Sequence, residues 1–151
     1  MPARIATPDD ADTFAPILRP ADATEVLRMG EGPVASVLRR SIARSVEAYV
    51  FEDGGHPLAV YGIVQPSAMD PMYGVPWLVG TRYLTARPKQ FLRETVAQMA
   101  IWRTRYTVMS NMVDARYAQA IRWLRWLGFS IGAPMATGLH GAPFRHIEMR
   151  A

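Results

Sequence analysis

The chain has 151 residues, half of them hydrophobic and a fifth charged, a composition that suits one globular domain with a sizeable core. It has no cysteine, which excludes disulfides, thiolate metal sites and a cysteine nucleophile. It has no long apolar run and no apolar segment near its start, so we expect neither a membrane span nor a secretory signal. The net charge is +4, but the basic residues are scattered, which argues against a nucleic-acid-binding surface.

Apolar periodicity and turn residues define successive elements along the first half of the chain. The segment Thr7-Pro8-Asp9-Asp10 has the N-cap candidate, the proline and the acidic residues that favour a helix start. Asp53-Gly54-Gly55 is typical of a tight turn between antiparallel strands. The predicted elements of this half are a strand over 4–7, helices over 8–18, 21–29 and 34–47, and strands over 48–52 and 57–65.

The second half begins with a loop over 66–76 that contains three prolines. The elements predicted after it are a strand over 77–84, a helix over 88–105, a strand over 106–110, a helix over 116–127 and strands over 129–131 and 144–149. The long helix is expected to turn these apolar residues toward the core: Phe91, Leu92, Val96, Met99 and Trp102. The order of elements predicts one α/β domain over residues 1–151.

The stretch ARYAQAIRWLRWLGF, residues 115–129, places most of its apolar residues on one side of a helix. The residues expected to face the core are Tyr117, Ala120, Ile121, Trp123, Leu124 and Leu127. On the opposite side Trp126 lies among Gln119, Arg122 and Arg125, so we expect Trp123 to be buried and Trp126 to be exposed. Arg122, Arg125 and Trp126, the Arg122/Arg125/Trp126 face, are a candidate interface. Packing of Trp126 under an arginine of the same chain and stacking on nucleic acid are the alternatives.

The stretches RIATPDD, residues 4–10, and AIRWLRWLGF, residues 120–129, carry a resemblance to a known family. Residues 4–10 resemble the opening strand and helix start of the GNAT family of N-acetyltransferases, and residues 120–129 resemble its closing A-x-x-x-Y-x-x-x-G-F helix. The resemblance implies a single GNAT-like domain with a mixed, mostly antiparallel central sheet flanked by helices. In that fold the sheet splays open to admit acyl-CoA.

Three shorter stretches resemble a group of small phage-encoded proteins with a GNAT-like fold: RPAD at 19–22, PWLVGT at 76–81 and RWLRWLGF at 122–129. This narrower resemblance implies a structural or interaction component of a virion, such as a neck, tail or internal protein. Its partners would be other virion proteins, copies of itself or both. It would be found in the cytoplasm of the bacterial host and in the phage particle.

The loop that holds the CoA pyrophosphate in active GNAT proteins reads Q/R-x-x-G-x-G/A, and this sequence departs from it. The matching residues 81–89 read TRYLTARPK, without a glycine, and a proline removes one backbone donor. Four side chains of this loop are candidates for holding the phosphates instead: Arg82, Thr85, Arg87 and Lys89. The alternative is a basic loop that faces solvent or a partner.

The family's general acid, a tyrosine on the closing helix, corresponds to Leu124, which cannot donate a proton to a departing thiolate. Tyr117, which lies about two turns earlier, is a poor replacement and could equally be a core or cleft-rim residue. Asn111 and Asp114 follow the strand that borders the acyl-CoA cleft in this fold, and they are the remaining catalytic candidates. Asp114 could instead be the N-cap of a helix that begins at Ala115.

Two functional hypotheses follow from these observations. The first is a GNAT-fold phage protein that serves as a structural or interaction component of the virion, has lost acyl transfer and needs no cofactor. The second is an acyl-CoA-dependent N-acyltransferase with a divergent pyrophosphate-binding loop, which would use acetyl-CoA. His56, His140 and His146 show no metal-ligand spacing, so we expect no metal site.

Overall fold

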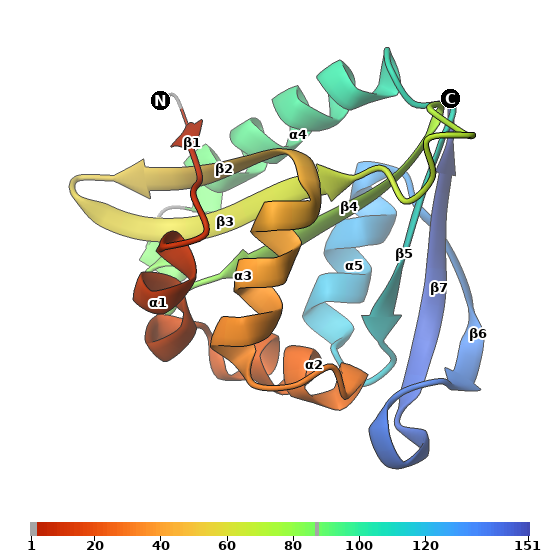
Figure 1. The fold of residues 1–151 in the computed structure, drawn as a ribbon, viewed down its shortest axis with the longest axis horizontal. Coiled ribbons are helices and arrows are strands. Elements are labelled where there is room, and N and C mark those ends of the chain that lie inside the picture. Colours follow the sequence, from red (N-terminus) through yellow and green to blue (C-terminus); the bar gives the residue numbers. More distant parts are fainter. Residues whose placement is uncertain (1–2, 87) are drawn as a thin grey trace.

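A mixed sheet forms the centre of the molecule, which the computed structural model describes over residues 3–86 and 88–151 (Figure 1). Within these residues the sheet has seven strands in the order β1-β2-β3-β4-β5-β7-β6. They are β1 (Arg4–Ile5), β2 (Ser45–Asp53), β3 (His56–Val64), β4 (Tyr73–Gly80), β5 (Val108–Asp114), β6 (Ser130–Ala136) and β7 (Pro143–Arg150). β4 and β5 are parallel and the other described neighbours are antiparallel, which confirms the predicted kind of sheet.

Helices cover both faces of this sheet. They are α1 (Asp10–Phe14), α2 (Pro20–Met29), α3 (Val34–Arg44), α4 (Pro88–Arg103) and α5 (Ala118–Leu127), with short 3-10 turns at Ala15–Ile17, Leu84–Ala86 and Leu139–Gly141. β3 shows the division, because successive strand residues point to opposite faces. Val60 packs with α1, α2 and α3 in one apolar cluster, whereas Tyr61 packs with α4 and α5 in the other. The order of helices and strands predicted from the sequence is confirmed.

The boundaries of α3 and the buried face of α4 differ from the prediction. α3 ends at Arg44 instead of Glu47, because Ser45 already pairs with Val64 of β3. Val96 was expected in the core but is 47% exposed, and Thr95 is buried in its place. The Thr95 hydroxyl donates to the Leu92 carbonyl at 3.0 Å, so it stays hydrogen-bonded on the apolar side of the helix.

β4 begins at Tyr73, within the proline-containing segment predicted as a loop, and ends at Gly80 instead of Leu84. Proline usually interrupts a central strand because it lacks the N–H that the ladder needs. Pro76 fits because its nitrogen and carbonyl point away from β3, toward β5. On that side its carbonyl accepts a hydrogen bond from Asn111 Nδ2 at 2.7 Å. By contrast, the predicted turn between β2 and β3 is confirmed, with positive φ values of 59° at Gly54 and 79° at Gly55.

Candidate functional site

β4 and β5 run side by side at their beginnings and then diverge to form a wedge. They pair in parallel register at Tyr73 with Val108 and at Gly74 with Met109. A cavity of about 700 Å³ occupies the wedge, with α2 and α3 in its wall on one face of the sheet and α4 and α5 on the other. This volume lies within the range of small-molecule sites, which span about 300–1,000 Å³.

The inner edge of β4 turns backbone hydrogen-bonding groups toward this cavity. The N–H of Gly80 donates to the Asp22 carboxylate, and its carbonyl accepts from the Arg19 N–H at 3.0 Å. Because the backbone direction alternates with a period of two, the N–H and carbonyl of Leu78 point the same way. Leu78 lines the cavity, and no described residue pairs with these two groups. An extended ligand can therefore lie against β4 as an added strand.

Asp22 of α2 ties together three segments that border the wedge, although it is only 4% exposed. Its carboxylate accepts hydrogen bonds from the Gly80 N–H of β4, from the Tyr117 hydroxyl before α5 and from Arg19 Nη2 at 3.1 Å. Gly80 permits this approach, because a Cβ there would lie 2.7 Å from Leu84 Cδ2 and 3.0 Å from Arg19 Nη2. Burying one carboxylate with several donors fixes the spacing of α2, β4 and α5.

Glu25 lies one turn after Asp22 on α2, and its side chain is in the wall of the cavity. Its Oε2 accepts the Asp114 N–H at 2.9 Å. Burial raises the pKa of Glu25 to about 7; the negative charges of Asp22 and Asp114 act in the same direction, and the Asp114 N–H and Arg19 oppose them. A carboxyl group with a pKa near neutrality can both accept and release a proton under ordinary conditions, which makes Glu25 a candidate general base.

The three catalytic candidates from the sequence have different positions. Asn111 and Tyr117 line the cavity, but Asp114 does not. Asn111 has a structural contact on each side of its amide, since Nδ2 bridges to Pro76 of β4 and Oδ1 accepts the Met112 N–H at 2.7 Å. Tyr117 donates to Asp22, and burial together with the Asp22 charge raises its pKa, so the hydroxyl keeps its proton.

Asp114 is 2% exposed and is held by an ion pair rather than placed for chemistry. Its Oδ2 lies 2.6 Å from Arg28 Nη1, and its Oδ1 accepts the Arg116 N–H at 2.9 Å. Burial favours the neutral acid, but these donors outweigh it and lower the pKa of Asp114. The N-cap interpretation is wrong, because α5 begins at Ala118 and its N-cap is Tyr117. Asp114 instead accepts the Arg116 N–H in the turn that precedes the helix.

The basic loop after β4 does not converge on one point. The Arg82 guanidinium turns to its neighbour Tyr83, donating to the hydroxyl at 3.0 Å and lying 5.1 Å from the ring centroid. Thr85 is exposed and lines the cavity beside the first residue of α4, whereas Lys89 is exposed without a described contact. The candidate Arg87 lies outside the described residues. Among the described candidates of this loop, Thr85 alone lies in the cavity wall, and it precedes α4, whose first-turn N–H groups have no partner within the helix.

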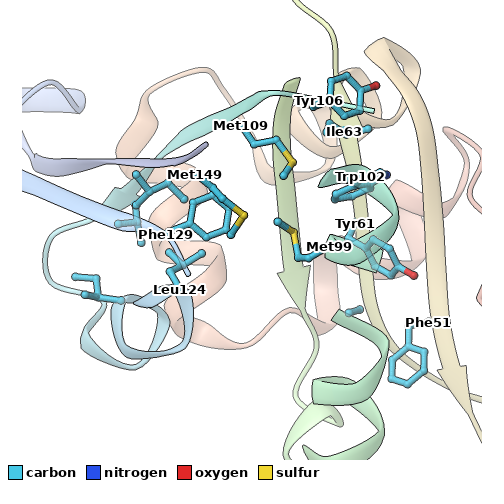
Figure 2. Packing of buried hydrophobic residues seen from close by; sticks show 14 of the residues in the cluster. Phe51, Tyr61, Ile63, Met99, Trp102, Tyr106, Met109, Leu124, Phe129 and Met149 are labelled. Carbon is cyan, nitrogen blue, oxygen red and sulfur yellow. The ribbon is translucent and has the colours of Figure 1, made fainter. Parts of the chain in front are cut away.

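Leu124, at the position of the family's tyrosine, is packed in the apolar core. Figure 2 shows it beside Phe129 and Met149, facing Met99 and Trp102 of α4 across the cluster. Leu124 is 8% exposed, and it also forms part of the cavity wall. Leu124 therefore offers no proton donor to the cavity.

The two tryptophans of α5 divide as the helical periodicity predicts, with one correction. Trp126 is 59% exposed, and Arg122 and Arg125 are exposed beside it. Trp123 is only partly buried: it lines the cavity and packs on Phe91, with ring centroids 5.6 Å apart. Its Nε1 is buried and has no hydrogen-bond partner among the described residues. The ring therefore leaves one polar group unsatisfied beside the cavity. The arginine-stacking alternative fails for Trp126, because the cation–π contact within the described residues joins Arg82 and Tyr83.

We expect Trp123→Ala to cost about 2–3 kcal/mol of folding free energy, somewhat less than a fully buried aromatic residue. Trp126→Ala is the matched control on the same helix and should change stability by about 0.5 kcal/mol or less. Chemical denaturation of both variants measures the difference. Equal losses would mean that Trp126 packs against the domain. A change of oligomeric state in Trp126→Ala alone would support the predicted interface.

Sequence reasoning missed Asp22 and Glu25. Asp22 stands out in the sequence only as part of RPAD, and Glu25 is an acidic residue in a short helix, a pattern that usually means a solvent-facing side chain. In the described part of the chain, no cluster of three histidine or acidic residues has the arrangement of a metal site. Nor does any described helix have the length and apolar character that crossing a bilayer requires.

Comparison with known proteins gives matches to structures only. No protein-family model and no curated protein matches the sequence. A ribosomal-protein α-N-acetyltransferase in complex with coenzyme A is 7% identical, with a TM-score of 0.71 over 98% of this chain and 92% of that chain.

Two further solved structures extend this likeness. The ribosomal-protein-alanine N-acetyltransferase from Brucella melitensis is 16% identical, with a TM-score of 0.68 over all of both chains. The candidate acetyltransferase yncA from Salmonella typhimurium, with its cofactor acetyl-CoA, is 15% identical, with a TM-score of 0.68 over 99% of this chain and 93% of that chain. The TM-scores of these matches show a shared fold, whereas identities this low carry no conclusion about activity. The chain thus has the fold of the GNAT acetyltransferases.

Proposed function

We propose that the protein is an acyl-CoA-dependent N-acyltransferase with a divergent pyrophosphate-binding loop, the second of the two hypotheses drawn from the sequence. The observation that carries the proposal is the wedge, in which an unpaired β4 edge and the Glu25 carboxyl border one cavity. Helices on both faces of the sheet line this cavity. Under this proposal two substrates would enter from opposite faces and meet between β4 and β5.

The residues of the wedge fit an acyl-CoA molecule in part. The Leu78 N–H and carbonyl would hold its amide-containing arm as an added strand. Thr85 and the first turn of α4 would hold its phosphates in place of the missing glycine loop. When bound, acyl-CoA supplies a thioester carbonyl that an amine can attack.

Glu25 would take the proton that an ammonium group must lose before its nitrogen can attack. With a pKa of about 7 it is ionised at slightly alkaline pH and is a stronger base than an ordinary carboxylate. Asp22 would act as a positioning residue, because it holds Tyr117 and Gly80 at the end of the wedge. Tyr117 is the hydroxyl group best placed to donate to a departing thiolate, although it first has to leave Asp22.

Calorimetric titration with acetyl-CoA tests the proposal, and we expect a Kd in the micromolar range, about 8 kcal/mol of binding free energy. Ala120→Phe should weaken binding at least about tenfold, because Ala120 of α5 lines the cavity and a phenyl ring would fill it. Ala118→Phe is the matched control, since Ala118 is exposed on the same helix outside the cavity wall. Absence of binding in the wild type, or an equal effect of both substitutions, would contradict the proposal.

The virion component remains the second candidate, and the core packing of Leu124 at the position of the general acid supports only the loss of acyl transfer that this hypothesis assumes. Under this hypothesis the Arg122/Arg125/Trp126 face would contact other virion proteins or another copy of the chain in the phage particle or host cytoplasm. A wild type that binds no acyl-CoA, together with a Trp126→Ala variant that no longer assembles, would favour it over the enzyme.

A further inference from the structure

We propose that Arg19 is a specificity-determining residue of the cavity and binds a carboxylate group on a small ligand with an apolar body. The inference rests on the proposed function only for the role of this ligand, which would be the second substrate. The carboxylate is assigned from the Arg19 guanidinium, because its hydrogen bonds leave one buried N–H group without an acceptor.

The buried donors that lack an acceptor are concentrated at the cavity. In the described part of the chain, two buried side-chain nitrogen atoms have no hydrogen-bond partner, Arg19 Nε and Trp123 Nε1, and both residues line the cavity. Buried N–H groups are rarely left unpaired in folded proteins, because losing water without gaining an acceptor costs free energy. A ligand that brings an acceptor oxygen into the cavity would remove this cost.

The Arg19 guanidinium is held in a fixed position. The Arg19 N–H donates to the Gly80 carbonyl of β4 at 3.0 Å, and Arg19 Nη2 lies 3.1 Å from Asp22 Oδ2. The guanidinium also lies against Gly80, where an added Cβ would be 3.0 Å from Nη2 and 3.1 Å from Cζ. A planar donor group that is already ordered loses little entropy on binding, and its N–H groups suit carboxylate oxygens.

Arg19 keeps donors for a ligand although it is paired with Asp22. Within the described contacts of this pair, Nη2 is the nitrogen that donates to Asp22. Asp22 also accepts from the Gly80 N–H and the Tyr117 hydroxyl, so its charge is shared among three donors. Burial raises the pKa of Glu25 and of Tyr117, and the Arg19 charge opposes the rise in both. Arg19 is therefore close enough to act on two other groups that line the same cavity.

The acidic groups of the wall do not prevent a carboxylate from binding. Arg19 is the one cation among the described residues of the wall, against the carboxyl groups of Asp22, Glu25 and Glu31. Asp22 is compensated by its three donors, and Glu25, with a pKa of about 7, is mainly protonated in slightly acidic solution. Glu31 is exposed, so solvent and salt screen its charge. Under these conditions Arg19 is the charge that attracts a ligand.

The wall formed by α2, α3 and β4 is mainly apolar, and it defines the body of the ligand. Its side chains include Val26 of α2, Val37 and Leu38 of α3, and Trp77 of β4. Trp77 is fixed in orientation, because its Nε1 donates to Ser45 Oγ at 2.8 Å. A fixed aromatic ring and branched aliphatic side chains favour an apolar body. The ligand class is thus an aliphatic or aromatic carboxylate, which under the proposed function also carries the group that is acylated.

Calorimetry with two ligands of one shape tests the inference: 3-phenylpropanoate, which carries a carboxylate, and 3-phenylpropanamide, which is neutral. Each is titrated in slightly acidic buffer into the wild type alone and into the wild type saturated with coenzyme A. We expect the carboxylate to bind at least about tenfold more tightly than the amide. Equal affinities, or no binding of the carboxylate under either condition, would overturn the inference and leave Arg19 Nε to water.

Arg19→Lys removes the Nε donor but keeps a positive charge beside Asp22. It should weaken the binding of 3-phenylpropanoate at least about tenfold and abolish the preference over the amide, because lysine has no planar donor group. Arg28→Lys is the matched control, since Arg28 is also paired with a buried aspartate, Asp114, at 2.6 Å but lies outside the cavity wall. A preference that survives Arg19→Lys, or equal losses in both variants, would overturn the inference.

A second pair of variants tests the charge without changing Arg19. Met29→Glu places a negative charge in the cavity wall and should weaken 3-phenylpropanoate at least about fivefold, while the neutral amide changes by less than about twofold. Leu27→Glu is the matched control, because Leu27 is 51% exposed and outside the wall, and it should leave both affinities unchanged. Equal weakening of the two ligands by Met29→Glu, or equal effects of the two variants, would place the carboxylate elsewhere and overturn the assignment.

The two proposals fail separately. If 3-phenylpropanoate binds with the expected preference but coenzyme A does not bind, the carboxylate site stands and the acyltransferase proposal falls. If coenzyme A binds and 3-phenylpropanoate gives no heat with or without it, the role of Arg19 falls and the acyltransferase proposal stands.

Discussion

Asp22→Ala is expected to lower the free energy of unfolding by about 3–5 kcal/mol, the usual cost of removing one partner of a buried ion pair. The loss is large because three donors lose their acceptor together: Arg19, the Gly80 N–H and the Tyr117 hydroxyl. Each unsatisfied buried donor costs about 1–3 kcal/mol when it cannot reach water. We also expect the variant to lose acyl-CoA binding, since the end of the wedge is no longer held.

Asp12→Ala is the control for this prediction. Asp12 also accepts from an arginine, with Arg39 Nη2 at 2.6 Å, but its side chain is 66% exposed. An exposed ion pair contributes about 0–1 kcal/mol. Urea denaturation of both variants should therefore separate them clearly. A loss below about 1 kcal/mol for Asp22→Ala would show that water or a rearranged side chain satisfies the donors.

The fold was predictable because its cues are local. Apolar periodicity marks the helices, and Gly54-Gly55 marks the hairpin, so the order of elements and the kind of sheet are confirmed. The errors come from tertiary contacts that periodicity cannot encode. Pro76 predicts a break in the strand, yet the neighbouring β5 supplies the Asn111 amide that its carbonyl needs. On α4, Thr95 is buried and Val96 is exposed, a choice between neighbouring positions that periodicity alone does not make.

The site was less predictable, because its residues meet only in three dimensions. Asp22 and Tyr117 are 95 positions apart, and Glu25 and Asp114 are 89 apart. Family resemblance points to the loop 81–89 and to Leu124, where this chain departs from the pattern. It gives no signal at Glu25, whose position against β5 follows from the packing of α2 across the wedge. The catalytic candidates Asn111 and Asp114 have mainly structural contacts, and Tyr117 is the one of the three that places a hydroxyl group in the cavity wall.

Glu25→Gln should make the protein more stable at pH 8 while removing most of its activity. Folding raises the pKa of Glu25 from 4.5 to about 7, so the folded chain holds this proton more tightly than the unfolded chain. The stability that this provides is complete below the unfolded pKa and is lost as the pH rises through about 7. Glutamine keeps an oxygen for the Asp114 N–H but never ionises. We expect its advantage over the wild type to grow by about 2–3 kcal/mol between pH 5 and pH 8.

The same substitution should reduce kcat for acyl transfer by about 10²–10⁴-fold, the range for a lost general base. In the wild type the rate should fall as the pH drops below about 7, because Glu25 then carries its proton before the amine arrives. Burial and the negative charges of Asp22 and Asp114 disfavour the ionised form of Glu25. The other groups around it are Arg19, Arg28, which is paired with Asp114, and the Tyr117 hydroxyl.

Glu31→Gln is the control for both effects, because Glu31 lines the same cavity but is exposed, and it should change neither the pH dependence of stability nor kcat by more than about twofold. Thermal melts across the pH range and rate profiles of the three proteins test the two effects separately. A Glu25→Gln variant that is active, with an unchanged pH profile, would move the base to another group. A variant without the gain at pH 8 would mean that water reaches the carboxylate and that the wedge is wetter than its apolar walls imply. A gain in stability together with a loss of activity is expected where an ionised group destabilises the fold but is required for the reaction.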